Sequence, residues 1–178
     1  MSLKTFVDAL PDYAKDLRLN LGSMLGDQTI GDNRKYGLIL ACAHGTGYRP
    51  IVEAAEAEVV GKLDEAYANA ARAAAAVMAM NNVYYRFVHL ASNPVYETLP
   101  ARLRMNVIGN PGIDKADFEL FSLAVSAQNG CGMCIDSHER VLSQHGVKPE
   151  AIQTAARIGA VMKAVATVHA TLPDAEAA

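Results

Sequence analysis

Two cysteines and a histidine lie together in one short segment of the chain, residues 129–138. Cys131 and Cys134 form a Cys-x-x-Cys pair, and His138 follows one helical turn after the second cysteine. An α-helix turns about 100° per residue, so Cys134 lies about 60° around the axis from Cys131, and His138 about 40° from Cys134. On one such face the two thiols can close a disulfide, and the histidine can accept a thiol proton.

The residues before the first cysteine predict how this helix begins. Asn129 and Gly130 are typical of a helix cap, which would place Cys131 in the first turn. Free N–H groups and the helix dipole favour a thiolate there. His138 instead lies beside Cys134. The helix dipole therefore favours a thiolate at Cys131, whereas the neighbouring base favours one at Cys134.

Two other interpretations of the cysteine pair stay open. A structural zinc site takes four protein ligands, but only Cys42 and four other histidines remain, and none forms a second paired motif. The cysteines could also be inert residues of a buried helix. The spacing favours a redox dithiol over both.

A carboxylate precedes the motif in the segment 114–125. Glu119 is flanked there by Phe118, Phe121 and Val125, whose spacing predicts burial. A glutamate beside an apolar surface could orient His138 or relay a proton. The alternative is an ordinary exposed glutamate near the start of a helix.

The remaining polar candidates are interpreted as structural. Cys42 is expected to be a small core residue. The pair Asn81-Asn82 is expected to end an apolar helix and to bond backbone. Two groups are expected on the surface or in structural roles: His44, His89, His145 and His169, and the helix face with Glu53, Glu56 and Glu58.

Composition restricts the class of protein. The 178 residues suffice for one domain with a sizeable core, and 51% of them are hydrophobic. A net charge of −3 gives no reason to expect binding to nucleic acid or to an anionic membrane. The longest apolar run, residues 73–80, is too short to span a bilayer. With no signal-peptide pattern at the start of the sequence, we expect a cytoplasmic protein, where a dithiol can cycle.

Apolar periodicity and turn residues predict an all-α fold that positions these side chains. No convincing strand is visible, and residues 92–99 are expected to form a loop, whereas residues 101–107 give no clear signal. We expect a frayed tail over residues 173–178. Helices are expected over residues 2–25 with a break near Pro11, 34–44 ended by Gly45, 50–61, 64–85, 115–128, 131–145 and 149–171.

The sequence also repeats itself when it is shifted by 85 positions. Gly45 then matches Gly130, and residues 70–72 match residues 155–157. We therefore predict a single domain, 1–178, with two related helical halves at about 30–90 and 115–172. Thr46, Arg49, Glu53 and Arg34 lie over Cys131, Cys134, His138 and Glu119. This places the redox chemistry in the second half and a structural role in the first.

Over almost its whole length the chain resembles the AhpD-type alkyl hydroperoxide reductases, of the carboxymuconolactone decarboxylase-like superfamily. The resemblance rests on Met-Asn-Asn-Val-Tyr-Tyr-Arg at 80–86, Leu-Arg-Met-Asn-Val-Ile-Gly-Asn-Pro-Gly-Ile at 103–113, Phe-Glu-Leu at 118–120, Ala-Val-Ser-Ala-Gln-Asn-Gly-Cys at 124–131, Cys134 and His-Glu at 138–139. It implies an all-α, AhpD-like fold and a homotrimer.

The resemblance also implies an activity and its partners. It implies an antioxidant peroxidase of alkyl hydroperoxides, with no bound cofactor and no metal. Electrons would come from a dihydrolipoyl group on a dihydrolipoamide acyltransferase. A further role would be to keep the peroxiredoxin AhpC reduced, through a mixed disulfide at Cys134.

Residue roles follow from the same resemblance. Cys134 would attack the peroxide and become a sulfenic acid, while Cys131 would resolve it and donate a proton. Glu119 and His138 would form the proton relay. The assignment of the attack to Cys134 is preferred over Cys131, because the base is adjacent and the dipole effect decays within the first turn. Members of the family often have a histidine where this chain has Met133, which removes that position from the relay.

Two alternative functions remain. A decarboxylase of the same superfamily has no use for two thiols, so the Cys-x-x-Cys pair argues against it. A helical interaction module could use the thiols as a redox sensor without turnover. Peroxide consumption with a lipoyl reductant would separate these functions.

Overall fold

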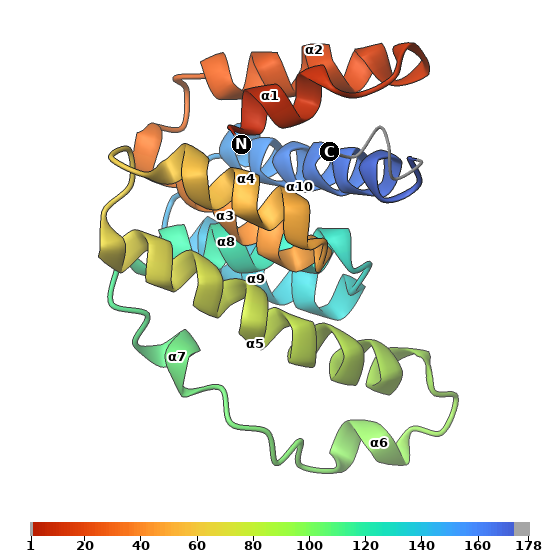
Figure 1. Ribbon diagram of the computed structural model, residues 1–178. Coiled ribbons are helices and arrows are strands. Elements are labelled where there is room, and N and C mark those ends of the chain that lie inside the picture. Colours follow the sequence, from red (N-terminus) through yellow and green to blue (C-terminus); the bar gives the residue numbers. More distant parts are fainter. Residues whose placement is uncertain (1, 173–178) are drawn as a thin grey trace.

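Helices follow one another along the described part of the chain, residues 2–172 of a computed structural model, and that part contains no strand. The predicted all-α fold is confirmed (Figure 1). The helices are α1 (Leu3–Asp8), the 3-10 helix η1 (Asp12–Ala14), α2 (Lys15–Gly26), α3 (Asp32–Thr46), α4 (Arg49–Val59), α5 (Glu65–Leu90), α6 (Val95–Thr98), α7 (Asn106–Gly109), α8 (Lys115–Gln128), α9 (Gly132–Gln144) and α10 (Pro149–Ala170). The expectation for residues 173–178 concerns positions outside the described range.

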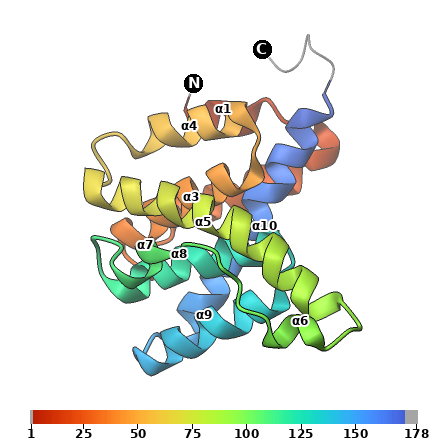
Figure 2. The same ribbon diagram turned by 90° about the horizontal axis from the view of Figure 1, so that it is seen from below.

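Helix α8 forms the centre of the molecule. Every residue from Ala116 to Ser126 is buried. Helices α3, α5, α9 and α10 all pack against it, and the view in Figure 2 shows α8 between α5, α9 and α10. Close packing requires small residues: a Cβ atom on Gly159 of α10 would lie 3.0 Å from the carbonyl oxygen of Ala124. Because α8 carries Glu119, this burial places the carboxylate inside the protein.

The helix starts follow local sequence signals. The side chain of Asp114 accepts a hydrogen bond from the Asp117 backbone N–H and caps α8 as predicted. Pro149 occupies the first turn of α10, where its missing N–H costs nothing. The break near Pro11 is also confirmed, since a 3-10 turn separates α1 from α2.

Two predicted helix ends are wrong. Helix α3 continues past Gly45 to Thr46, and Gly47 ends it with a φ of 69°. Gly45 instead allows close packing, since a Cβ there would lie 2.5 Å from Oε1 of Gln128. Helix α5 continues through Asn81-Asn82 to Leu90, and within it the Asn82 side chain bonds to Ser126 and Asn129, whereas the buried Oδ1 of Asn81 has no hydrogen-bond partner among the described residues.

The long connection after α5 is partly helical. Short helices α6 and α7 interrupt residues 91–114, where a loop and an unassigned stretch were expected. In Figure 1, α6 lies away from the body of the molecule, beyond the end of α5. None of the described helices has the length and apolar character needed to cross a bilayer.

The order of helices is compatible with the predicted repeat. Helices α3, α4 and α5 follow one another in the first half, and α8, α9 and α10 do so in the second. The relation between the two halves stays a prediction. Helix α5 belongs to the first half but packs on both α8 and α9. The position of α5 therefore brings the first half into contact with the helix that carries the cysteines.

Candidate active site

The two cysteines of the motif are joined at the start of α9. Cys131 and Cys134 form a disulfide, with their Cα atoms 5.3 Å apart. Cys131 is the N-cap of α9, and its sulfur accepts a hydrogen bond from the Cys134 backbone N–H at 3.3 Å. The prediction that Asn129 and Gly130 cap this helix is wrong, because the chain adopts extended geometry only at Cys131. The sulfur of Cys131 thus occupies the usual place of a capping oxygen.

Glu119 and His138 meet between two helices. Oε2 of Glu119, on α8, lies 2.5 Å from Nδ1 of His138, on α9. Both side chains are buried, and Glu119 is only 2% exposed. The structure therefore brings together the two residues that the sequence proposed as a relay and excludes the alternative of an exposed glutamate.

The charge state of Glu119 results from opposing effects. Burial raises its pKa, but hydrogen bonds and charges from His138 and Lys115 outweigh burial and leave the pKa below its ordinary value. Glu119 is consequently ionised near neutral pH and accepts the Nδ1–H of His138. That bond leaves Nε2 of His138 as the nitrogen that can exchange a proton.

Lys115 completes the carboxylate's surroundings. Its Nζ atom lies 2.8 Å from Oε1 of Glu119 and donates a hydrogen bond to the carbonyl oxygen of Ile108 at 2.5 Å. The two oxygens of Glu119 therefore have separate partners. Lys115 lies four residues before Glu119, so helical spacing could have identified the pair from the sequence.

A cavity of about 430 Å³ opens onto this group. Cys134 lines it, whereas Cys131 is 0% exposed and lies behind its partner. The wall is largely apolar and contains three thioethers. The lining residues are Met78, Asn81, Tyr85, Met105, Ile108, Lys115, Glu119, Met133, Cys134, Ser137, His138 and Val141.

Helix α5 contributes contacts that the sequence interpretation missed. The sulfur of Met78 lies 3.2 Å from Nε2 of His138, and the carbonyl oxygen of Asn81 lies 4.0 Å from the sulfur of Cys134. No hydrogen bond joins His138 to Cys134 in this disulfide state. Helix α5, which belongs to the first half, therefore forms one wall of the cavity, and the expectation of a structural role for the first half stays a prediction.

Asn82 supports the segment before the cysteines from the same helix. Its Nδ2 atom donates to the hydroxyl of Ser126 at 2.9 Å, and its Oδ1 atom accepts from Nδ2 of Asn129 at 2.9 Å. Arg86 donates to the carbonyl oxygen of Asn129 at 2.7 Å. These bonds hold the turn between α8 and α9, rather than ending α5 as predicted.

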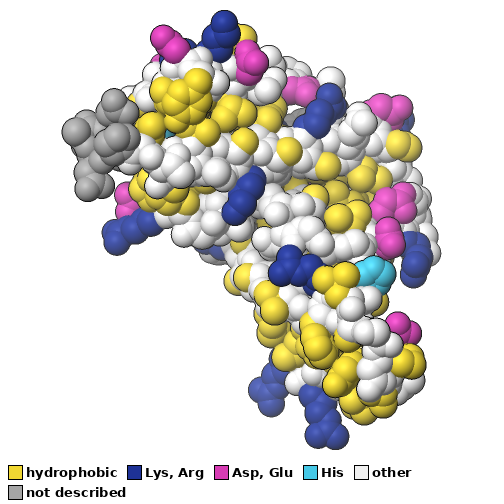
Figure 3. All heavy atoms as spheres, turned by 90° about the vertical axis from the view of Figure 1, so that its right-hand side faces the viewer, with side chains coloured by type: hydrophobic (Ala, Val, Ile, Leu, Met, Phe, Trp, Pro, Cys, Tyr) yellow, Lys and Arg dark blue, Asp and Glu magenta, His cyan; other side chains and the backbone are white. Residues whose placement is uncertain are grey.

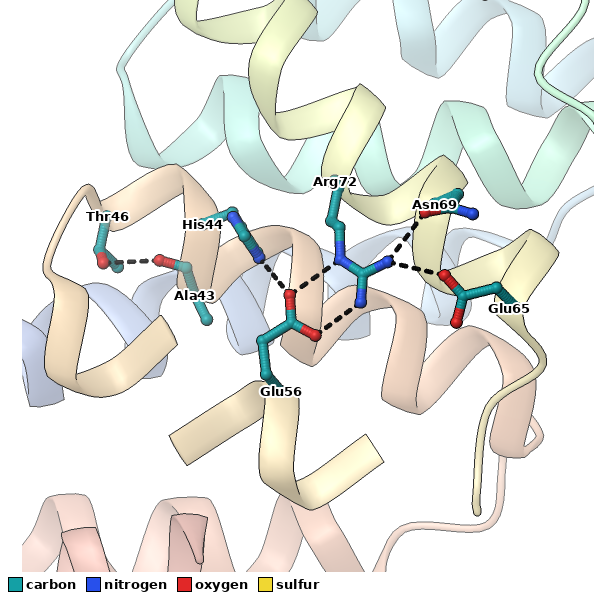
Figure 4. Close-up of polar contacts among 7 residues, drawn as sticks. All are labelled: Ala43, His44, Thr46, Glu56, Glu65, Asn69 and Arg72. Carbon is teal, nitrogen blue, oxygen red and sulfur yellow. Dashed lines mark hydrogen bonds and ion pairs between the residues drawn. The ribbon is translucent and has the colours of Figure 1, made fainter. Parts of the chain in front are cut away.

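A second glutamate–histidine pair lies in the first half. Nε2 of His44 is 2.8 Å from Oε1 of Glu56, and Arg72 binds both oxygens of Glu56, at 2.8 and 2.7 Å (Figure 4). Figure 4 also shows Arg72 reaching Glu65 and Asn69 on α5. The expectation that Glu56 belongs to a solvated helix face is wrong, because the guanidinium and the imidazole enclose its carboxylate.

The other candidates occupy structural positions. Cys42 is buried and free, as predicted, and burial raises the pKa of its thiol far above the ordinary range. His169 is buried against Phe6, with ring centroids 3.9 Å apart. Within residues 2–172, no group of three or more histidine, cysteine, aspartate or glutamate side chains is placed to hold a metal ion.

Comparisons with known proteins give consistent names. The sequence profile of the carboxymuconolactone decarboxylase family matches residues 94–177. The chain is 78% identical to alkyl hydroperoxide reductase AhpD of Rhizorhabdus wittichii, over 96% of this chain and 99% of the relative. It is 63% identical to the protein of that name from Rhodopseudomonas palustris, over 93% and 92% of the two chains. The AhpD of Hyphomonas neptunium is 59% identical, over 96% and 94%.

Identity at this level over nearly the full length covers the cysteine motif, α8 and α5 together. The buried Glu119–His138 pair and the disulfide beside it lie within the matched region. The chain therefore belongs to the AhpD family of alkyl hydroperoxide reductases, within the carboxymuconolactone decarboxylase superfamily.

Proposed function

We propose that this protein is an antioxidant thiol peroxidase that reduces alkyl hydroperoxides by a Cys131–Cys134 dithiol/disulfide cycle. The observation that carries the proposal is the position of Cys134, which faces an apolar cavity together with the buried Glu119–His138 pair. An organic hydroperoxide suits this cavity, because the wall accepts its apolar chain and the reactive groups lie together. The family names of the relatives support the same reaction class.

The oxidative step begins with the reduced dithiol. Nε2 of His138 takes the proton of Cys134, while ionised Glu119 stabilises the resulting imidazolium through Nδ1. The thiolate attacks the distal peroxide oxygen and breaks the O–O bond, leaving a sulfenic acid on Cys134. His138 returns its proton to the departing alkoxide, which leaves as the alcohol.

Cys131 then closes the cycle. Its thiol condenses with the sulfenic acid, releasing water and forming the disulfide seen in the structure. In the reductive step, an incoming thiolate reaches Cys134 through the cavity, and the sulfur of Cys131 leaves. The backbone N–H of Cys134 already points at that sulfur, so the start of α9 stabilises the departing thiolate.

A dihydrolipoyl group is the reductant that fits this exchange. Its two thiols supply the two electrons and two protons that convert one hydroperoxide into alcohol and water. We assign its source to a lipoylated dihydrolipoamide acyltransferase. The same cavity-facing sulfur of Cys134 would form a mixed disulfide with the peroxiredoxin AhpC and reduce it. We place this chemistry in the cytoplasm, where thiols are kept reduced.

A homotrimer is the assembly that we propose. Val83, Phe87 and Leu90 form an exposed apolar stripe at helical spacing on the end of α5, and Val95, Tyr96 and Leu99 continue it. Figure 3 shows hydrophobic side chains gathered on the lower, projecting part of the molecule, where Figure 1 places α6. Contact with another copy would remove this apolar surface from water.

The decisive experiment supplies electrons only through dihydrolipoamide and dihydrolipoamide dehydrogenase, and follows NADH oxidation after adding cumene hydroperoxide. We expect turnover that depends on both cysteines. Reversible oxidation of the dithiol without sustained turnover would instead support a redox sensor, and an inert disulfide would support the decarboxylase alternative.

A further inference from the structure

A single lysine side chain is fixed at the edge of the candidate active site. Nζ of Lys115 is 2.8 Å from Oε1 of Glu119 and 2.5 Å from the carbonyl oxygen of Ile108. We propose that Lys115 is a positioning residue of the proton relay, which keeps the Glu119 carboxylate ionised and aimed at His138 while the imidazole gains and loses its proton. This inference rests on the proposed thiol chemistry.

The need for such a cation follows from the burial of Glu119. A carboxylate that is 2% exposed has lost most of its hydration, which favours the protonated form. The imidazole of His138 cannot offset this cost throughout the cycle, because its charge disappears each time it releases the proton. Lys115 is charged in both states, so it alone supplies a constant positive partner.

The groups around Glu119 leave this role to Lys115. Helix α9 presents His138 and Cys134 to the cavity, and α5 presents the phenol of Tyr85. Helices α3 and α10 contribute no residue to the cavity lining. The cations on α3 have other partners, because Arg34 pairs with Asp117 and Lys35 with Asp32. Among the described residues that line the cavity, Lys115 is the only lysine or arginine.

Its second bond separates Lys115 from an ordinary helical ion pair. Exposed pairs four residues apart are weakly coupled, because both side chains move freely in water. Here one partner is buried, and the Ile108 carbonyl of α7 accepts a second hydrogen bond from the ammonium. The lysine thus links the wall formed by α7 to the carboxylate of α8.

Thiol alkylation tests this role without requiring peroxide. In a Cys131→Ser background, the rate at which iodoacetamide modifies Cys134 between pH 5 and 9 reports the thiolate fraction. Lys115→Met should raise the pH midpoint of the alkylation profile by about one unit. At pH values below the midpoint, Cys134 should then be alkylated about tenfold more slowly. Lys115→Arg should stay within about twofold of the parent.

Further variants control for folding and for direct effects on the thiol. Lys115→Gln is also neutral but can still donate to Ile108, so it should match Lys115→Met. Exposed Lys163 on α10 provides the matched control Lys163→Met, which should leave the profile unchanged. In a Glu119→Gln background, Lys115→Met should have no further effect if the lysine acts through the carboxylate.

Two results would overturn the inference. One is an alkylation profile of both neutral variants that coincides with the parent. The other is an undiminished effect of Lys115→Met in the Glu119→Gln background, which would mean that the lysine acts directly on the thiol. A protein that passes these tests but consumes no hydroperoxide would refute the proposed function and leave the role of Lys115 intact.

Discussion

Residues 2–172, the described part of the chain, contain two glutamate–histidine pairs, each with a cation on the carboxylate. Glu119 binds His138 and Lys115 in the second half, and Glu56 binds His44 and Arg72 in the first. The first group faces a cavity beside a disulfide. The second group joins α3, α4 and α5 (Figure 4). Because similar polar partners occur in both places, the partners alone do not define an active site.

The two carboxylates differ in burial and in the strength of their cation. Glu119 is almost fully buried and has a single ammonium contact, whereas the Glu56 side chain is 32% accessible and receives a bidentate guanidinium. The hydrogen bonds from Arg72 lower the pKa of Glu56 to about 2, with burial opposing them and His44 adding to them. Such a strongly held carboxylate is suited to linking helices, and poorly suited to exchanging partners during a reaction.

The two halves also differ in the residues beside these pairs, Thr46 at the end of α3 and Cys131 at the start of α9. Thr46, which the predicted repeat places over Cys131, donates its hydroxyl to the carbonyl oxygen of Ala43 at 2.7 Å. Its oxygen also accepts the backbone N–H of Tyr48 at 3.1 Å. Cys131 offers a sulfur at the corresponding turn, which both caps the helix and forms a disulfide. A thiol and a cavity, and not the glutamate–histidine pair alone, therefore distinguish the second half from the first.

Removing the thiol should have the largest effect. Cys134→Ser should abolish hydroperoxide reduction, because no thiol remains on the cavity wall. Cys131→Ser should permit one attack and then stop at the sulfenic acid. A dimedone-type probe, read by mass spectrometry, should label Cys134 in the Cys131→Ser protein only. Labelling of Cys131 in the Cys134→Ser protein, with activity retained, would reverse the two roles.

Removing the relay should have the next largest effect. His138→Phe and Glu119→Gln should each lower kcat/KM by about 10²–10⁴-fold, the usual contribution of general-base assistance. The matched change His44→Phe removes the equivalent histidine of the other pair and should leave kcat/KM unchanged. Steady-state rates at neutral pH test the contrast, and equal losses in both pairs would contradict it.

Breaking the other pair should cost stability instead of turnover. Glu56→Gln should lower the free energy of unfolding by about 1 kcal/mol at neutral pH, after allowance for solvent screening of a partly exposed group. Because the folded-state pKa of Glu56 is depressed, its stabilisation is present above pH 4.5 and is lost as the pH falls towards about 2. Urea unfolding across that pH range should show that the free energy of unfolding falls less steeply with acidification in the variant than in the parent. The same pH dependence of the unfolding free energy in variant and parent would argue against a stabilising Glu56–Arg72 ion pair.

The surface positions of the first half should have the smallest effect. Arg49 and Glu53 lie over Cys134 and His138 in the predicted repeat, and they form an exposed ion pair with side chains 88% and 63% accessible. Arg49→Ala and Glu53→Ala should change the free energy of unfolding by at most about 0.5 kcal/mol and leave the rate per dithiol unchanged. Rates normalised to titrated thiols would test this, and a large rate loss in a folded variant would assign chemistry to this face.

The sequence was most informative where a single helix holds the chemistry. The spacing of Cys131, Cys134 and His138 indicated a shared face, and all three side chains are buried, with Cys134 and His138 lining the cavity. Local signals also predicted most helix starts, since caps and prolines act within a few residues. Glu119 was recognisable as a candidate from its apolar neighbours and from the resemblance to a known family.

The contacts of α5 could not be predicted in this way. Met78 reaches His138 across 60 positions, and Asn82 reaches Asn129 across 47. Consecutive polar residues in an apolar helix indicated an end, because the helix alone offers them no partners. The partners of Asn82 come from α8 and from the turn after it, and α5 continues as one helix to Leu90.

The all-α fold and the grouping of Cys131, Cys134 and His138 could be predicted from the amino-acid sequence alone, because these depend on helical periodicity and on residue chemistry. The cysteine that faces the cavity, the cap formed by Cys131 and the contacts of Lys115 and Met78 with the Glu119–His138 pair are visible only in the folded structure. The folded structure also shows that the Glu119–His138 pair lines a cavity and that the Glu56–His44 pair links helices. The physical reason is that burial, cavities and the pairing of charges depend on how distant helices pack, which local periodicity does not encode.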